Sequence, residues 1–226
     1  MKLLLTSGGV TNASIRSELV DLVGKPIDEC DALFIPTAQW GHPMCSPQTA
    51  LMSVAGRTPG TQDLVELGWR SVGLLELAAL PSIASERWKR WIRDADVLLV
   101  GGGEAMYLVH WIRESGLADL LPALAQTVWV GVSAGSMALT PRVGTEFVSW
   151  NPHAGDEALG LVDFSLFPHL DYPGWSSNTT ASARRWATKI DGPAYAIDDQ
   201  TAIAVVDGDV RIVSEGSWES FNLETS

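Results

Sequence analysis

The sequence has few cysteines, few basic residues and no long apolar run, and each shortage argues against a class of protein. Cys30 and Cys45 are the only cysteines among 226 residues, so they could form one disulfide at most and no disulfide framework. Fifteen basic residues against 27 acidic ones give a net charge of −12, which argues against a nucleic-acid partner and disfavours anionic membranes. Because no stretch of about 18 apolar residues is present, no transmembrane helix is expected.

The first residues and the overall composition indicate an ordinary folded protein. The opening MKLLLTSGGV has an apolar run too short for a signal peptide, and no small-residue cleavage site follows it. We therefore expect a soluble cytoplasmic protein. A hydrophobic content of 46% allows a substantial core. No linker, repeat or low-complexity segment interrupts the chain, so we expect residues 1–226 to form one domain.

Short apolar runs alternate with amphipathic stretches in the first part of the chain. The runs are continuous, as in strands of a parallel sheet that is covered by helices on both faces. They predict strands at Lys2–Thr6, Ala32–Ile35, Ser71–Leu75, Val97–Val100 and Val128–Val132. The stretches between them predict helices at Ser14–Val23, Thr61–Glu66, Ser85–Arg93 and Tyr107–Arg113.

The pattern changes beyond Leu139, where strand signals follow one another without clear helices between them. Asp207-Gly208 is typical of a hairpin turn. Strands and helices that alternate and then end in antiparallel strands predict an α/β fold, a three-layer sandwich with a mostly parallel sheet and a mixed edge. The later strands are predicted at Thr145–Trp150, Ala194–Ile197, Thr201–Val206 and Val210–Val213.

The segment WVGVSAGSMAL, residues 129–139, contains the Gly-x-Ser-x-Gly pattern of a nucleophile elbow. In this pattern the serine lies in a strained turn between a strand and a helix, with small residues on either side. The amide of the following residue, Ala134, then points toward a developing oxyanion. An ordinary small-residue corner could give the same letters, but the flanking strand and helix are those that the elbow requires. We therefore predict that Ser133 is a nucleophile.

A serine nucleophile needs a base, and the chain has four histidines. His110 lies in a helical stretch and His42 in a loop without a signature, whereas His153, in Asn-Pro-His-Ala-Gly, is a serious competitor. His169 follows the apolar run of DFSLFPHLD and so lies at a strand end, where α/β sheets place their sites. No pair of histidines has metal-ligand spacing, so neither a metal nor a cofactor is predicted.

An acidic residue should orient the histidine, and a group of amides should bind the oxyanion. Asp198 and Asp199 lie between two predicted strands, and Asp163 and Asp171 are alternatives closer to His169 in the sequence. The triple glycine at 101–103 follows the strand at Val97–Val100, where backbone amides can approach a ligand. It lacks both phosphate-loop patterns, which favours an oxyanion over a nucleotide.

Together these segments resemble the peptidase E family of serine peptidases, with cyanophycinase as a more distant relative. The matching segments are an amino-terminal strand ending in Ser-Gly-Gly, VLLVGGG, GVSAGS, DFSLFPHLD and AIDDQTAIAVVDG, which span most of Lys2 to Gly208. The resemblance implies a flavodoxin-like, glutaminase-like sandwich, consistent with the predicted elements. It also implies hydrolysis of short peptides by an exopeptidase or dipeptidase. Because the family often forms dimers, a homodimer is a further expectation.

The resemblance assigns a role to each member of the predicted site. Ser133 matches the nucleophile and His169 the general base, while Asp199 falls at the acidic third member. Asp198, one residue away, stays an alternative. The oxyanion hole would be formed by the amides of Gly102 or Gly103 and of Ala134.

Two departures from the family pattern concern substrate binding. Asparagine commonly follows the triple glycine, whereas this chain has Glu104. Peptidase E would have Gly-Glu-Thr-Arg after the histidine, with the arginine holding a substrate aspartate. Here Ala181 takes that position, and Arg184 and Arg185 follow about one helical turn later. A neutral pocket would not offset the desolvation of a carboxylate. The aspartyl specificity is therefore left open, with Glu104, Arg184 and Arg185 as candidate substrate-binding residues.

Two alternative functions use the same fold. An esterase or amidase could share the elbow, although a glutamine amidotransferase would need a cysteine there, and neither cysteine lies at that position. A non-catalytic binding protein could keep the fold without a competent pocket. Glu104 favours this alternative, because a carboxylate beside the oxyanion hole disfavours a second negative charge.

Overall fold

The main sheet of the protein follows the order β3-β2-β4-β5-β1-β8-β9. The computed structural model describes residues 1–57, 64–151 and 155–223. Strands β1 to β5 of this sheet are parallel, whereas β8 is antiparallel to β1 and β9 to β8. This mixed edge confirms the predicted α/β class. The strands are β1 (Lys2–Thr6), β2 (Asp31–Ile35), β3 (Ser71–Leu74), β4 (Val97–Val100), β5 (Val128–Val132), β8 (Thr201–Val206) and β9 (Asp209–Ser214).

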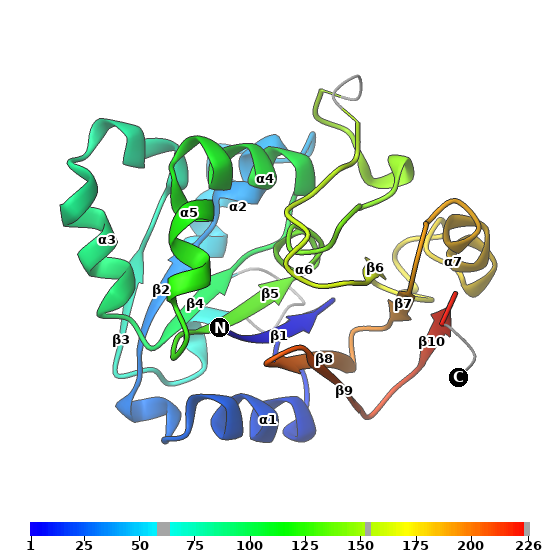
Figure 1. Ribbon diagram of the computed structural model, residues 1–226, viewed down its shortest axis with the longest axis horizontal. Coiled ribbons are helices and arrows are strands. Elements are labelled where there is room, and N and C mark those ends of the chain that lie inside the picture. The colour runs from blue at the N-terminus through cyan, green and yellow to red at the C-terminus, as the bar shows by residue number, and fades with distance from the viewer. Residues whose placement is uncertain (58–63, 152–154, 224–226) are drawn as a thin grey trace.

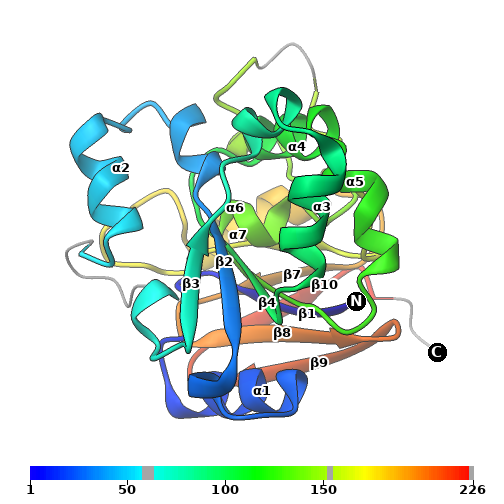
Figure 2. The same ribbon diagram turned by 90° about the vertical axis from the view of Figure 1, so that its left-hand side faces the viewer.

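Helices cover both faces of this sheet (Figure 1 and Figure 2), which gives the three-layer arrangement. In both views α1 (Ala13–Val23) lies on one face, and α3 (Ser85–Arg93), α4 (Ala105–Glu114) and α5 (Leu117–Leu120) lie on the other. No helix in the described part of the chain is long and apolar enough to cross a membrane. The remaining helices are α2 (Pro47–Val54), α6 (Ala134–Met137) and α7 (Thr180–Ala187). Short 3₁₀ helices lie at Ile27–Glu29, Thr37–Gly41, Leu64–Glu66, Leu77–Ser82, Leu121–Ala123 and Thr145–Phe147.

The helix α2 was not predicted, because its sequence has almost no buried face. Ala50 is its only buried residue, so no apolar stripe marks it. Local capping stabilises it instead. Ser46 and Thr49 form a reciprocal capping box, and Pro47 occupies the first helical position, where its missing N–H leaves no bond unmade.

A second sheet of three strands lies beside the main one (Figure 1). It consists of β6 (Ser165–Phe167), β7 (Ala194–Ile197) and β10 (Trp218–Phe221). The strand β6 is parallel to β7, and β10 is antiparallel to it. Ala183 and Trp186 of α7 pack with this sheet in a small core of their own. The sequence pattern predicts β7 and an apolar run at β6, but it predicts neither β10 nor a separate sheet.

Two other predicted elements differ from the structure. The strand predicted at Thr145–Trp150 is wrong, because Thr145–Phe147 is a 3₁₀ helix and the amides of Ser149 and Trp150 bind the Glu104 carboxylate rather than a neighbouring strand. Of the helix predicted at Thr61–Glu66, residues 61–63 lie outside the described residues, and the rest is 3₁₀ helix.

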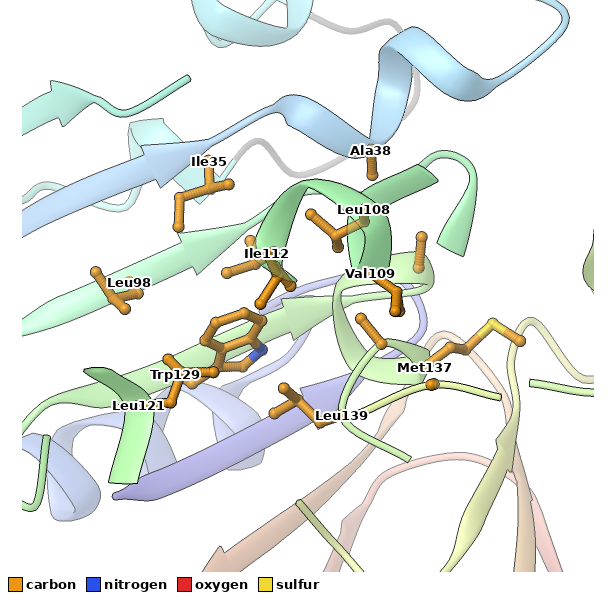
Figure 3. Packing of buried hydrophobic residues seen from close by; sticks show 14 of the residues in the cluster. Ile35, Ala38, Leu98, Leu108, Val109, Ile112, Leu121, Trp129, Met137 and Leu139 are labelled. Atoms are coloured by element: carbon orange, nitrogen blue, oxygen red, sulfur yellow. The ribbon is translucent and has the colours of Figure 1, made fainter. Parts of the chain in front are cut away.

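The core lies in two hydrophobic clusters, one on each face of the main sheet. Figure 3 shows part of the first, in which Trp129 of β5 lies next to Ile112 of α4, and Leu98 of β4 lies further along the sheet. Trp129 is fully buried, and its Nε1 donates to the Gly135 carbonyl at 2.9 Å. The core therefore fixes the turn that follows β5. The second cluster includes Leu4, Leu99, Ile15, Leu19 and Leu22.

Candidate active site

Ser133 lies directly between β5 and α6, in a backbone conformation that residues other than glycine seldom adopt. Its φ is 50° and its ψ is −108°. Hydrogen bonds on both sides hold this turn. The Ser133 amide donates to the Thr6 carbonyl at 2.9 Å, and the amides of Ser136 and Met137 donate to the Ser133 carbonyl, each at 2.9 Å. A strained, well-supported serine at a strand-to-helix turn has the geometry of a nucleophile elbow.

The two glycines of the elbow are required by close backbone contacts. A Cβ added at Gly135 would lie 2.2 Å from the Val100 carbonyl oxygen, and one added at Gly131 would lie 2.6 Å from the Gly135 carbonyl oxygen. Real Cβ atoms do not approach backbone this closely. The Gly-x-Ser-x-Gly pattern therefore has a steric cause at both ends, because β5, α6 and β4 meet here.

Two buried side chains that the sequence analysis did not single out tie β1 to the elbow. Ser136 Oγ donates to the Thr6 carbonyl at 2.8 Å and accepts from the Thr6 amide at 2.9 Å. Thr6 Oγ1 donates to the Gly131 carbonyl at 2.7 Å. Both residues are fully buried. Thr6 and Ser136 lie in the segments TSGG and GVSAGS, which is the only indication of their role in the sequence. Their contact becomes visible only once β1 is paired with β5.

His169 comes directly after β6 and Pro168, with a φ of 55°. Its amide donates to Ser7 Oγ at 3.0 Å, and Ser7 Oγ donates to the Ile197 carbonyl at 3.0 Å. The His169 Nδ1 atom lies 2.7 Å from Asp199 Oδ1. The two side chains are only 11% and 26% exposed, so this contact is partly shielded from water. The ends of β1, β6 and β7 thus bring together residues 7, 169 and 199.

The structure separates the four candidate acids by what each carboxylate contacts. Asp199 contacts the His169 ring, whereas Asp198 accepts hydrogen bonds from the Gln200 and Ser217 amides and the Thr201 hydroxyl. Asp171 binds Thr180, whose hydroxyl and amide lower the pKa of the Asp171 carboxyl. Asp163 is exposed and lies outside the cavity that contains Ser133.

Of the other histidines, His42 lines the cavity and His110 does not. His42 is exposed, and its Nδ1 accepts from the Met44 amide at 3.2 Å. The His110 ring packs against Trp111 and Trp150, outside the cavity lining. His153 lies outside the described residues. In the part of the chain that the structure describes, no group of three or more His, Cys, Asp or Glu residues is placed to hold a metal ion.

Ser133 and His169 line a common cavity of about 760 Å³. The Trp175 ring packs edge to face on the His169 ring, with 4.5 Å between centroids. The hydrogen bonds among the described residues include none between Ser133 Oγ and the imidazole, a bond that often tightens only when substrate binds. Further walls of the cavity come from the 3₁₀ helix at Thr145–Phe147, from Ser176, Ser177 and Asn178, and from α7.

Three amides beside Ser133 are available to a ligand. The amides of Gly101 and Glu104 donate to Ile35 and Ala38 carbonyls at 3.0 and 2.9 Å, whereas no backbone hydrogen bond within the described residues uses those of Gly102, Gly103 or Ala134. A Cβ added at Gly103, where φ is 144°, would lie 2.3 Å from the Ala38 carbonyl, so this position excludes a side chain. The predicted oxyanion-hole residues thus lie beside Ser133, with amides that are unbonded within the described part of the chain, and their role in binding an oxyanion stays a prediction.

Glu104, a predicted substrate-binding candidate, lines the cavity and also caps the helix α4. It is 2% exposed. Its Oε2 accepts from the Tyr107 amide at 2.6 Å, and its Oε1 accepts from the Ser149 and Trp150 amides at 2.9 and 3.0 Å. These three bonds occupy both oxygens and stabilise the negative charge. The carboxylate therefore caps α4 and holds the loop at 149–150. This structural role weakens the argument that Glu104 favours a non-catalytic binding protein.

Arg184 and Arg185 point to different surroundings. Arg184 forms a two-pronged ion pair with Glu219 of β10 and does not line the cavity, which argues against its predicted role in binding substrate. Arg185 does line the cavity, where its guanidinium donates to Ser182 Oγ at 2.9 Å. The neighbouring Lys189 lines it too, but is paired with Glu146.

The fold and this site define a class of protein, α/β proteins with a serine on a strand-to-helix elbow and a histidine–acid pair beside it. A model of peptidase family S51 matches residues 3–213 of the chain. The chain therefore belongs to peptidase family S51, and it is a serine-type peptidase.

Individual relatives agree with this membership. Peptidase E of Shewanella denitrificans is 28% identical over 222 residues, which cover 93% of this chain and 86% of that protein. Peptidase E of Shewanella amazonensis is 35% identical over 124 residues, about half of each chain (50% and 51%). The crystal structure of a peptidase from an acI-B1 Actinobacterium matches with a TM-score of 0.69 at 19% identity, over 98% of this chain and 96% of that one. That likeness shows the fold.

Proposed function

We propose that the protein hydrolyses short peptides as an exopeptidase, with Ser133 as nucleophile, His169 as general base and Asp199 as the residue that orients the imidazole. The 2.7 Å contact between His169 Nδ1 and Asp199 Oδ1 carries this proposal, because His169 lines the same cavity as Ser133, a serine on a strained elbow. Such a contact leaves Nε2 as the proton acceptor and stabilises the imidazolium that forms.

The reaction follows from these positions. Ser133 Oγ attacks the scissile carbonyl carbon as His169 Nε2 takes its proton, and the carbonyl becomes an oxyanion that accepts hydrogen bonds from the amides of Ala134 and Gly102 or Gly103. His169 then gives the proton to the leaving amine, and the C–N bond breaks. Water, deprotonated by His169, attacks the ester carbonyl, and His169 returns the proton to Ser133 Oγ as the bond between Oγ and the acyl carbon breaks and the acid leaves.

A fluorophosphonate should label the protein at Ser133 and at no other serine. The Ser133 oxygen displaces fluoride from phosphorus, a reaction that needs an activated serine and an oxyanion hole. Peptide mass spectrometry locates the adduct. The Ser133→Ala variant should stay unlabelled, and Ser82→Ala, which removes an exposed serine outside the cavity, should label like the wild type.

Other results of the labelling experiment favour the alternative functions. No adduct at Ser133 in folded protein would favour a non-catalytic binding protein. If the serine is labelled, turnover of matched ester and peptide substrates distinguishes an esterase from a peptidase. A protein that cleaves only the ester would contradict the proposed peptidase activity.

We further propose that Arg185 binds an acidic side chain on the acyl side of the scissile bond. Arg184 and Lys189 each have a carboxylate partner, whereas the hydrogen bond that Arg185 makes among the described residues is to a neutral hydroxyl. Ala181 and Arg185 are four residues apart in α7, so they lie on the same helical face. Arg185 can therefore supply the cation that the family places one turn earlier.

Replacing Arg185 with alanine should lower kcat/KM for substrates with an acyl-side aspartate by about tenfold, the effect of losing one solvent-accessible charge-assisted pair. Because Arg185 is exposed, a larger loss is not expected. Cleavage of matched asparaginyl substrates should change little. Arg184→Ala is the matched control, because it removes the neighbouring cation outside the cavity. Equal losses for aspartyl and asparaginyl substrates would contradict a role in recognising charge.

A further inference from the structure

Ser133 lies at the meeting point of two cavities. The second has a volume of about 330 Å³ and lies between the elbow and the chain segment at 39–53. Residues that line both cavities include Gly103, Ser133, His169 and Trp175. A peptide bond placed over Ser133 would therefore have a cavity on either side.

We propose that the smaller cavity binds the residue on the leaving-group side of the scissile bond and selects a neutral side chain. This inference rests on the proposed function, in which Arg185 holds the acyl-side residue in the larger cavity. A scissile carbonyl at Ser133 Oγ joins one acyl-side residue to one leaving residue. Since Arg185 lines the larger cavity and not the smaller one, the leaving residue is assigned to the smaller.

The chemistry of the smaller cavity favours an uncharged ligand. Among the residues that the structure describes, no aspartate, glutamate, lysine or arginine lines it, and its titratable lining side chains are Cys45, His42 and His169. A charged side chain placed there would lose hydration without gaining an ion pair. Apolar and neutral polar side chains make up the rest of the wall, among them Met44, Cys45, Val132, Gln39 and Thr49.

The wall opposite Ser133 is held by hydrogen bonds of its own. The His42 amide donates to the Gln39 carbonyl at 3.0 Å, and the Cys45 amide donates to the His42 carbonyl at 2.9 Å. The capping box of Ser46 and Thr49 then begins α2. A wall ordered before substrate arrives can discriminate among side chains, because little binding energy is lost in ordering it.

Cys45 provides a direct test, because its half-buried thiol lies in this wall. The other thiol, Cys30, is fully buried, and burial raises the pKa of the Cys30 thiol, so it should react slowly. Alkylation by N-ethylmaleimide, checked by mass spectrometry, would place a bulky group in the smaller cavity. The expected result is a fall of about tenfold or more in kcat/KM for aspartyl-leucine. Labelling of Ser133 by a small fluorophosphonate should stay within about twofold of the untreated protein.

Controls separate this inference from the proposed function. The Cys45→Ala variant, assayed with and without the reagent, should show no effect of treatment. Cys45→Trp fills the same space without any reagent and should reproduce the loss. If cleavage is undiminished after complete modification of Cys45, the inference about the smaller cavity is overturned. Labelling of Ser133 in the same modified protein would still support the proposed function. Loss of labelling together with cleavage would also overturn it, because the reagent would then act on the whole site.

A substrate panel tests the selection itself. Untreated protein should cleave aspartyl-leucine about tenfold faster, in kcat/KM, than aspartyl-lysine and aspartyl-glutamate. Cys45→Trp should reduce that preference, because it removes the leucine subsite without changing Arg185. Equal kcat/KM values for the three dipeptides in the wild type would overturn the inference. If the Ser133→Ala variant then cleaved none of them, the proposed function would still be supported.

Discussion

Replacing Ser133 with alanine is expected to lower kcat for peptide hydrolysis by about 10⁴-fold or more, while the protein stays folded. The reason is that the alanine side chain has no oxygen to form the acyl-enzyme, and the remaining amides and histidine can only position water. Folding should be kept, because the Ser133 side chain caps no helix and the bonds that hold the turn come from its backbone. Single-turnover kinetics on aspartyl dipeptides, with circular dichroism as the fold check, measure both effects.

Ser136→Ala is the matched control for this prediction. The residue is three positions further on and is fully buried, but its hydroxyl serves structure, since it bonds both the amide and the carbonyl of Thr6. We expect this variant to lose about 1–3 kcal/mol of unfolding free energy and much less of its turnover than Ser133→Ala. Full peptidase activity in Ser133→Ala would contradict the proposed mechanism. Equal losses of kcat in the two variants would point to a damaged elbow rather than to a missing nucleophile.

The main sheet and the elbow were predictable because they rest on local patterns. Four of the five early strands are continuous apolar runs that lie inside the sheet, and GVSAGS carries its own steric requirement at Gly131 and Gly135. The exception is β3, where Val72 and Leu74 are exposed because this strand forms the edge. Periodicity alone does not distinguish an edge strand from a central one.

The sequence could not show which member of the pairs Asp198/Asp199 and Arg184/Arg185 belongs to the site. Adjacent residues at a strand end or in a helix point in different directions, so their surroundings differ although their sequence positions are almost the same. Asp199 meets His169 while Asp198 binds Ser217, from the turn before β10. In α7, Arg185 faces the cavity, whereas Arg184 reaches Glu219 of β10. In both cases the deciding partner comes from the second sheet or its approach, which the sequence analysis did not predict.

The role of Glu104 was missed for a related reason. Its partners Ser149 and Trp150 are 45 and 46 residues away in the sequence. Without knowledge of these partners, only the negative charge of Glu104 beside the triple glycine could be interpreted. A buried carboxylate that accepts three backbone amides is a structural element, and its charge is already stabilised before substrate binds. Long-range backbone contacts of this kind leave no pattern in a single sequence.

The second large effect is expected from Gly135→Ala, which should destabilise the protein by about 3 kcal/mol or more and abolish most activity. The added Cβ would lie 2.2 Å from the Val100 carbonyl oxygen and 2.9 Å from its carbon, both backbone atoms of β4. No side-chain rotation can relieve that contact, so either α6 or β4 must move. Either movement shifts Ser133 relative to Gly102 and His169. Urea unfolding followed by tryptophan fluorescence gives the free energy, and kcat/KM gives the functional loss.

Gly192→Ala separates this contact from the ordinary effect of removing a glycine. Gly192 has a φ of 87°, and no atom of the described residues lies within 4 Å of an added Cβ, so alanine there should cost about 1 kcal/mol through backbone conformation alone. Gly135 is not among the glycines with positive φ, and it lies in α6, where alanine is intrinsically favoured. A loss at Gly135 that exceeds the loss at Gly192 therefore measures the contact of the elbow with β4. If Gly135→Ala instead kept wild-type stability and turnover, close packing against β4 would not be what positions the nucleophile.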